Sequence, residues 1–311
     1  MKGQCPRPLD DGSPVKSYYI SNYLVKTQCD KYLLKGDLMF KLSSDTKVKI
    51  LQATVYATLI ATLFLSFNGA LLLAGLAMGW FWWLVGINAG LHKYSSHRTF
   101  EPKNKFVKSF ILFVSSLCSL GSNISWACTH RKHHKFSDNE GDPHSPNLNG
   151  GGFWRGLRLW FYYFPTYHIS PRTVKDLTID PLHKWFHQNY YKVIGAYVLV
   201  LALIDIRLVG YLWALPAVYV FTGISYITVL AHKPWLGRLI GYRLYETTDK
   251  TFDSKIMSLL LPGEGNHNTH HALPGLARNA TQDGDWDLGF WFIKLVGNVP
   301  AEQETKQTYH T

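Results

Sequence analysis

Residues 50–91 read ILQATVYATLIATLFLSFNGALLLAGLAMGWFWWLVGINAGL, a stretch of 42 residues without Asp, Glu, Lys, Arg or His. A helix that crosses a bilayer needs about 20 apolar residues. The stretch therefore predicts two spans, at about 50–67 and 70–91, with Asn68-Gly69 as the turn between them. The alternative is a pair of buried helices in a soluble protein, but such helices rarely run this long without a charge.

A second pair of spans is expected between residues 190 and 231. Residues 208–231 carry no charge, and residues 193–204 form a shorter uncharged run that Lys192 and Asp205 can extend toward the membrane surfaces. We place these spans at about 190–206 and 208–231, with an exposed turn at Asp205-Ile206-Arg207. The uncharged stretch 109–129 is rich in Ser, which favours an interfacial or protein-buried helix over a fifth span.

Basic residues predict the orientation. They precede the first span, follow the second and follow the fourth, whereas the two tight turns carry one Arg between them. The positive-inside rule then places both termini and the middle loop in the cytoplasm. The expected protein is an all-α integral membrane protein with four transmembrane helices in two hairpins. Residues 1–45 form a polar tail without a secretory signal pattern, 46–300 the main domain with a cytosolic helical cap (92–189 and 232–300), and 301–311 a second tail.

The composition excludes several other classes. Aromatic residues make up 15% of the 311 residues, which argues against disorder, and four Cys are too few for a disulfide scaffold. The net charge of +11 suggests an anionic partner, either nucleic acid or a lipid surface. Because no nucleic-acid motif is present, we assign the charge to the membrane surface and to partner docking.

Eight of the 14 His form three tight groups: His92 and His97; His130, His133 and His134; and His267, His270 and His271. On a helix, positions i, i+3 and i+4 share one face, so each His-x-x-His-His triplet is expected to project its imidazoles in one direction. The i, i+5 spacing of the first pair suits a helix end that unwinds as the chain leaves the membrane. The stretch 109–129 must then not cross, since all three groups have to meet on one side.

The type of metal follows from the donors. Neutral imidazole binds Fe, Zn, Cu and Ni, and structural zinc sites usually include Cys, which shows no metal-binding spacing here. Eight or more imidazoles exceed the needs of one ion and predict two redox metals. The Glu-x-x-His pattern of soluble di-iron proteins is missing from the sequence.

These motifs resemble the membrane fatty-acyl desaturases, most closely the stearoyl-CoA (delta-9) type. The matching text is Gly86-Ile-Asn-Ala-Gly90 before His92, His97-Arg98, His130-Arg-Lys-His-His-Lys-Phe-Ser137, Asp142-Pro-His-Ser145 and Gly263-Glu-Gly-Asn-His-Asn-Thr-His-His271. The resemblance covers residues 45–300 and implies four transmembrane helices under a cytosolic cap.

The resemblance also implies a site. A ninth ligand, His232, completes the set formed by His92, His97, His130, His133, His134, His267, His270 and His271, which would hold two Fe ions. Thr228 stands where the family has an Asn linked to a metal through water. Asp142 and Glu264 either orient ligand imidazoles or are ordinary loop residues.

The substrate side of the site is expected around Trp126, which matches a family Trp beside the acyl chain, together with Asn123 and Trp83. The aromatic run Trp80–Trp83 either lines this tunnel or forms a belt that faces lipid. Cys128 and Thr129 replace the charged pair that helps animal enzymes bind CoA, so the acyl carrier, CoA or lipid, stays open.

Of the remaining His, His144 is expected to support the site, while His168, His183, His187 and His310 are expected on the surface. Asn279-Ala280-Thr281 matches a glycosylation pattern but falls on the cytoplasmic side.

The activity implied by the resemblance is O2-dependent insertion of a cis double bond, of delta-9 type, into a saturated acyl chain. A separate electron donor such as cytochrome b5 or ferredoxin would be needed, and the membrane would be the endoplasmic reticulum in a eukaryote or the inner or thylakoid membrane in a bacterium. One alternative is a membrane di-iron fatty acyl or alkyl hydroxylase. The other is a non-enzymatic metal transporter, which would place its ligands at mid-membrane depth.

Overall fold

The computed structural model describes residues 44–148, 154–157, 171–282 and 284–301. Within these ranges the protein is mostly helical, which confirms the predicted helical class for this part of the chain. Its two strands have two residues each, and β1 (Glu101–Pro102) pairs antiparallel with β2 (Gly297–Asn298). The tails expected at 1–45 and 301–311 lie almost wholly outside the described residues.

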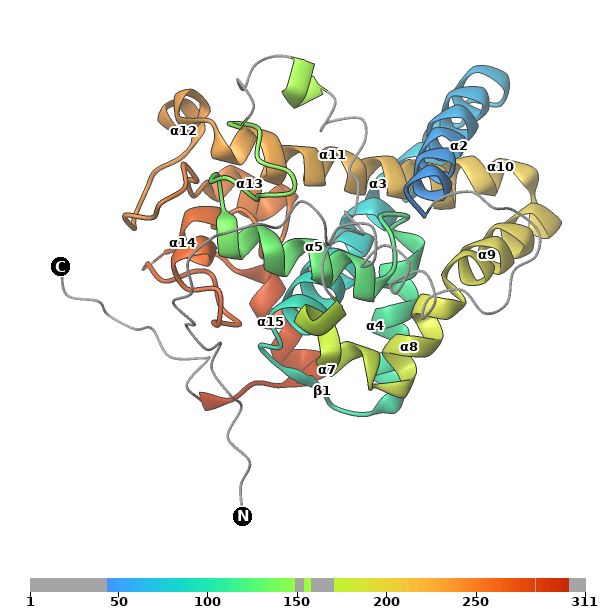
Figure 1. The fold of residues 1–311 in the computed structure, drawn as a ribbon. Helices are drawn as coiled ribbons and strands as arrows, with labels where there is room; N and C mark the ends of the chain where they lie inside the picture. Colours follow the sequence, from blue (N-terminus) through green and yellow to red (C-terminus); the bar gives the residue numbers. More distant parts are fainter. Residues whose placement is uncertain (1–43, 149–153, 158–170, 283, 302–311) are drawn as a thin grey trace, which may run out of the picture. The chain divides into compact units, whose positions relative to one another are not determined.

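Three helical stretches among the described residues are long and apolar enough to cross a membrane: Thr46–Leu65, Gly69–Ser96 and Ile206–His232. They comprise, in turn, α2 (Ser44–Leu65); α3 (Gly69–Trp82) with the π-helix η1 (Trp83–Ser96); and α10 (Ile206–Val209), η3 (Gly210–Ala214), α11 (Leu215–Val229) and η4 (Leu230–His232). The helix α9 (Tyr190–Ile204) is apolar but has only 15 residues. Figure 1 shows α11 beside α3, with α10 at one end of α11 and α12 at the other.

The predicted turn at Asn68-Gly69 is confirmed. The side chain of Asn68 caps α3 by accepting the N–H of Leu71, 3.0 Å away. The backbone N–H of Asn68 donates to the hydroxyl of Tyr211 (2.7 Å), which in turn donates to the carbonyl of Ser66 (3.1 Å). Tyr211 therefore ties this turn to the third apolar stretch. The turn predicted around Asp205 is also present, because Asp205 ends α9 and caps α10.

The second apolar stretch does not end at Leu91 as predicted. It continues through His92 to Ser96 as η1, and the N–H of His97 donates to the carbonyl of His92 at 3.1 Å. The expectation that this helix end unwinds was therefore wrong. A π-turn bonds residue i+5 to residue i, so it accommodates the five-residue spacing of the two histidines without breaking the helix.

The Ser-rich stretch 109–129 is divided between two helices, α4 (Lys105–Leu117) and α5 (Asn123–Phe136). Between them Ser119 and Gly121 have positive φ angles of 59° and 97°, which a helix cannot contain. The two helices have 13 and 14 residues, and the prediction that this stretch does not cross the membrane stays a prediction. The helix α4 packs closely on η1, and the hydroxyl of Ser115 donates to the carbonyl of Gly86 at 3.0 Å.

Shorter helices complete the described fold. They are the 3-10 helix η2 (Pro171–Val174), α7 (Lys175–Thr178), α8 (Pro181–Gln188), α12 (Pro234–Ile240), α13 (Lys255–Leu260), α14 (His267–Ala272) and α15 (Leu288–Val296). The main core lies between the apolar stretches and includes the fully buried Trp82 and Trp83. The second apolar stretch ends at Ser96, directly before His97, and the third ends at His232, so their ends carry two of the predicted ligands toward α5 and α14.

Candidate metal centre

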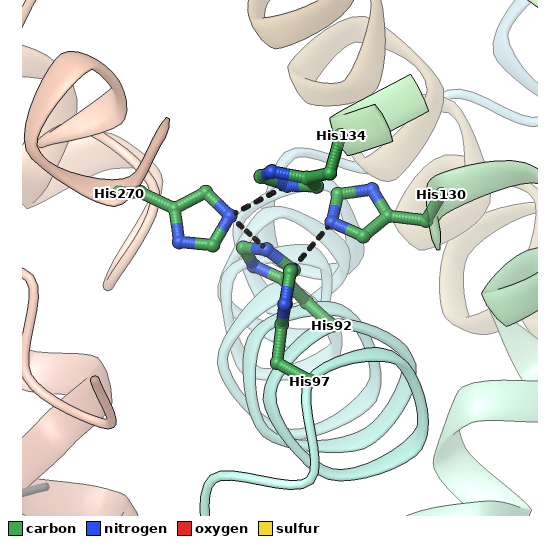
Figure 2. Close-up of side chains that lie close together, drawn as sticks. All are labelled: His92, His97, His130, His134 and His270. Carbon is green, nitrogen blue, oxygen red and sulfur yellow. Dashed lines mark hydrogen bonds between the residues drawn. The ribbon is translucent and has the colours of Figure 1, made fainter. Parts of the chain in front are cut away.

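Five of the predicted ligands form one cluster, which we call the first histidine group. It contains His92, His97, His130, His134 and His270, whose nearest ring nitrogens all lie within 4.8 Å of one another. The Nε2 atoms of His92 and His270 are 2.8 Å apart, and those of His97 and His130 are 2.9 Å apart. Figure 2 shows the five rings converging from η1, α5 and α14. All three sequence motifs therefore contribute to this one cluster.

A second histidine group lies beside the first and contains His133, His232 and His271, again within 4.8 Å. His267 adjoins it, with its ring centroid 4.5 Å from that of His271 and 5.4 Å from that of His232. The two groups are in contact, since the rings of His133 and His134 are 5.7 Å apart. The structure thus brings together all nine histidines that the sequence singled out.

The two triplets do not each point in one direction, so that expectation was wrong. Successive residues on an α-helix are rotated by about 100°. On α5, His130 and His134 therefore face the first group while His133 faces the second. On α14, His270 joins the first group, and His267 and His271 turn to the second. Each triplet spans a wide enough arc to serve two neighbouring centres.

Four carboxylates hold the outer nitrogens of these rings. Glu264 accepts from Nδ1 of His92, and Asp142 from Nδ1 of His133 at 2.9 Å. Nδ1 of His232 lies 2.8 Å from Asp138, and Nδ1 of His271 lies 2.8 Å from Asp249. Such partners orient metal-binding imidazoles and raise their basicity. Asp142 and Glu264 therefore each contact one of the predicted ligand imidazoles, which agrees with the first of the two alternatives expected for them.

Sequence reasoning missed Asp138 and Asp249. Asp138 follows His134 by four residues, in a turn whose acidic character was visible, but its partner His232 lies 94 residues further on. Asp249 lies in a segment without any motif. Burial by itself would raise the pKa of each carboxyl, but the hydrogen bonds from His232 and His271 hold both well below their usual range. Both therefore accept as carboxylates at neutral pH.

The donor set fits metal ions. Burial lowers the pKa of His97, His130, His134 and His270 well below the ordinary value, so these rings are neutral and offer a lone pair. In the second group, Nε2 of His232, Nε2 of His271 and both ring nitrogens of His267 are buried and make no hydrogen bond within the described residues. Buried polar atoms are normally satisfied. Buried ring nitrogens that converge from several segments are what an all-nitrogen site for two transition metals requires.

Comparison with known proteins identifies the chain. Residues 38–285 match the fatty acid desaturase family. The chain is 31% identical to the sn-1 stearoyl-lipid 9-desaturase of Anabaena variabilis over 236 residues, which cover 74% of this chain and 82% of the relative. The chain belongs to the fatty acid desaturase family. It is a delta-9 desaturase-like member, and so an oxidoreductase that acts on an acyl-lipid or an acyl-CoA.

Other desaturase relatives have the same character. Delta-9 acyl-lipid desaturase 1 of Arabidopsis thaliana is 28% identical, over 72% of this chain and 74% of its own length. A probable acyl-CoA desaturase of Schizosaccharomyces pombe is also 28% identical, over 68% of this chain but 44% of its own length. The resemblance seen in the histidine motifs is thereby confirmed at the level of the family.

The remaining residues expected in this desaturase site lie near the histidine groups or on the elements that carry them. The Trp126 indole stacks on the His130 ring, with centroids 6.2 Å apart and an interplanar angle of 16°. Asn123 is buried one turn earlier and donates to the carbonyl of His183 at 3.5 Å. Trp83 is buried at the start of η1, where its ring packs against Gly223. The hydroxyl of Thr228 donates to the carbonyl of Ile224 in its own helix at 2.8 Å, and its role toward a metal stays a prediction.

Other residues of the desaturase chain occupy positions that differ from expectation. His183 is fully buried between Asp180 (3.1 Å) and Ser95 (3.4 Å), so its prediction as a surface residue was wrong. His187 is half-buried against Ser122. His144 stacks on His133 with centroids 4.2 Å apart, in keeping with a supporting role. Trp82 and Trp83 are both buried within the protein, so neither belongs to a lipid-facing belt. His168 and His310 lie outside the described residues.

Two cations that sequence reasoning passed over, the part-buried Arg131 and the buried Lys93, fasten the ligand-bearing helices of the desaturase. Arg131 uses all five N–H donors: on the carbonyls of Ser95 (2.9 Å), Ser96 (2.8 Å) and Thr173 (2.6 Å), and on both oxygens of Asp176. Arg131 joins α5 to the end of η1.

The Nζ of Lys93 donates to Asn279 at 2.7 Å, and Asn279 is buried and also bonded to Gly263. The glycosylation pattern at Asn279 is therefore inaccessible.

Proposed function

We propose that this protein is an O2-dependent di-iron desaturase that inserts a cis double bond at the delta-9 position of a lipid-bound saturated acyl chain. The observation that carries the proposal is the meeting of nine imidazoles from distant segments in two adjacent groups, backed by four carboxylates. Family membership supplies the reaction class. The first group would hold one iron, and the second group, with His267, the other.

Irons bound there supply the oxidising power that unactivated C–H bonds require, which no side chain offers. The chain's own residues prepare the site for them. Glu264, Asp142, Asp138 and Asp249 keep Nδ1 of their imidazoles occupied, so that Nε2 faces inward. Burial keeps the rings neutral. Trp126 and Asn123, at the start of α5, lie on the side from which we expect the acyl chain to approach His130.

An acyl-lipid is proposed as the substrate on two grounds. Several relatives are named as acyl-lipid desaturases. In addition, the two positions before the second motif carry no charge for a CoA headgroup: Thr129 is buried with its hydroxyl on the carbonyl of Ser125, and Cys128 contacts Thr173. We propose four spans, with α9 as the third, and both termini in the cytoplasm.

The test is expression in a desaturase-deficient host that requires unsaturated fatty acids. Extracted lipids are separated by class, and double-bond positions are mapped by mass spectrometry. We expect a cis delta-9 acyl chain that appears in a glycerolipid before it appears in the acyl-CoA pool. A hydroxylated chain as the main product would instead establish the hydroxylase alternative. Purified protein with fewer than two irons per chain and no lipid product would defeat the proposal.

A further inference from the structure

The carboxylate that contacts His271 is carried by a closed loop, residues 242–253, which we call the Asp249 loop. Its ends pair as an antiparallel bridge: the N–H of Tyr242 donates to the carbonyl of Asp253 at 2.8 Å, and the N–H of Asp253 donates to the carbonyl of Tyr242 at 2.7 Å. Asp249 lies between these ends and is buried. The position of its carboxylate therefore depends on what holds the loop.

Apolar packing does not hold this part of the chain. No residue from Arg243 to Thr251 belongs to the buried apolar clusters of the described structure. An open pocket of about 530 Å³ is lined both by Tyr245–Asp249 and by the ends of α5 and α14. A loop that borders open space keeps many conformations unless hydrogen bonds remove them. Hydrogen bonds therefore have to fix the carboxylate beside His271.

Asn268 makes such bonds from the ligand-bearing helix itself. It lies on α14 between His267 and His270 and is fully buried. Its Oδ1 accepts the N–H groups of Leu244 (3.0 Å) and Tyr245 (2.8 Å). Its Nδ2 donates to the carbonyl of Tyr245 at 3.1 Å. Both ends of the side-chain amide therefore bind the Asp249 loop.

Two threonines of the loop continue the connection from Asn268 to Asp249. Nδ2 of Asn268 lies 3.4 Å from the hydroxyls of both Thr247 and Thr251. Each of these hydroxyls donates to Oδ1 of Asp249, that of Thr247 at 2.9 Å. The other carboxylate oxygen, Oδ2, accepts from Nδ1 of His271 at 2.8 Å. A continuous chain of hydrogen bonds thus runs from Asn268 to a histidine of the same helix.

Arg243 closes the same loop from its exposed side. Its guanidinium donates to the carbonyls of Thr247 (2.9 Å), Asp249 (3.0 Å) and Thr251 (3.0 Å). These three bonds lie within the loop, and Arg243 itself is an exposed residue. A substitution there therefore loosens the loop while the buried side of α14 stays intact.

We propose that Asn268 is a positioning residue of the second histidine group: it holds the Asp249 loop so that Asp249 stays on Nδ1 of His271 and Nε2 of His271 stays free for a metal. The inference rests on the proposed function. A carboxylate on one ring nitrogen orients the imidazole and strengthens metal binding at the other. In the first group, His92 is held by Glu264, which lies outside the loop. Loss of Asn268 should therefore weaken one of two metal sites.

The first experiment follows the release of iron from the full-length protein, loaded with iron in nanodiscs, to a competing chelator. In Asn268→Ala one of the two irons should leave about tenfold faster or more, while the other keeps its wild-type rate. The control is Asn189→Ala, because the Asn189 side chain bonds to the carbonyl of Trp185 at 3.0 Å, outside both histidine groups; both of its irons should leave at the wild-type rate. Unchanged release in Asn268→Ala, or equal acceleration of both irons, would overturn the inference. Wild-type protein that retains fewer than two irons would instead defeat the proposed function.

A double-mutant cycle separates positioning from a general loss of structure. If Asn268 acts through Asp249, then Asn268→Ala should have almost no further effect on iron release once Asp249→Asn has been introduced. Two effects that add in full would show that Asn268 only stabilises the fold, and the inference would be wrong.

A variant on the exposed side of the loop keeps the test open if Asn268→Ala does not fold. Arg243→Gln should accelerate release of one iron, and this effect too should vanish in the Asp249→Asn background. Lys250→Gln removes the same charge from another exposed residue of the loop and should leave release unchanged. Wild-type release in Arg243→Gln, or the same acceleration in Lys250→Gln, would contradict the positioning role of the loop.

Discussion

The backbone N–H of His97 donates to the carbonyl of His92 at 3.1 Å, and this single π-turn places both rings in the first histidine group. Their ring centroids are 4.9 Å apart. An α-helical turn would set residues five apart at about 140° around the axis. The π-helix η1 reduces that divergence and continues the second apolar stretch directly into the candidate metal centre.

The close packing of η1 on α4 should be essential to the site. A Cβ at Gly90 would lie 2.0 Å from Oγ of Ser115 and 3.1 Å from Ile111, whereas a Cβ at Gly195, within α9, meets nothing within 4 Å. Gly90→Ala should cost about 1–3 kcal/mol through overpacking and lower the iron content. Gly195→Ala should be neutral or slightly stabilising. Thermal unfolding and iron analysis in detergent test this pair, and equal behaviour of the two variants would contradict the packing argument.

Loss of a single histidine from the first group should abolish desaturation without preventing membrane insertion. His130→Ala and His270→Ala each remove a buried ring with a nitrogen that lies within 4.8 Å of the ring nitrogens of the other members of the group. His187→Ala, which removes a half-buried ring bonded to Ser122 outside both groups, is the control and should keep most activity. Product lipids and membrane-extracted protein are measured in a desaturase-deficient host. Full activity in either group variant would disprove its role as a ligand.

The two carboxylates that the sequence did not reveal should tune metal binding. Asp138→Asn and Asp249→Asn keep the shape of the side chain but remove the charge that holds His232 and His271. Each should weaken iron binding or activity by about 10–100-fold. Asp205→Asn serves as the control, because Asn also caps a helix well. Iron retention is followed against a competing chelator, and wild-type retention in both variants would remove these carboxylates from the site.

Arg131 should contribute to stability through its shape as well as its charge. Arg131→Lys keeps the charge but loses the forked contact with Asp176 and the bonds to the end of η1. We expect a loss of about 2 kcal/mol, as is typical for hydrogen bonds to charged groups, and a lower iron content. Lys132→Arg, its neighbour, should stay within about 0.5 kcal/mol of wild type. Unchanged unfolding of Arg131→Lys would show that the network adds nothing.

The metal-free protein should lose stability as the pH falls below about 6.5. Burial lowers the pKa of His271 to about 4, although its bond to Asp249 opposes this, and lowers the pKa of His267 well below the ordinary value. The unfolded chain then binds more protons than the folded chain, so unfolding becomes easier with acid. Asp142 acts in the same sense at lower pH, because its pKa is also lowered in the folded protein and its contribution is lost only as the pH falls below about 4. Melting temperatures at pH 7.5, 6.5 and 5.5 should fall in that order, and a flat profile would contradict the burial of neutral rings.

Much of the fold was predictable because the signals are local. An uncharged stretch of this length has few alternatives to membrane helices, and Asn68 caps α3 with its own neighbour Leu71. The histidine motifs pointed to eight residues and the family resemblance added His232, and the structure brings all nine together. Two local expectations failed for equally local reasons: a π-helix replaced the unwound end at His92, and the 100° step of α5 split its triplet between two groups.

The sequence by itself determined the long apolar helices, the histidine donors and the family, because charge-free runs, helical spacing and short motifs need only neighbouring residues. Only the tertiary structure decided which imidazole lies in which histidine group. It also decided that Asp138 contacts His232, that Asp249 contacts His271, and that an open pocket lies beside His134 and His271. The physical reason is that these relationships join residues far apart in the chain. Their distances follow from how η1, α5, α14 and the end of α11 pack, which no local pattern encodes.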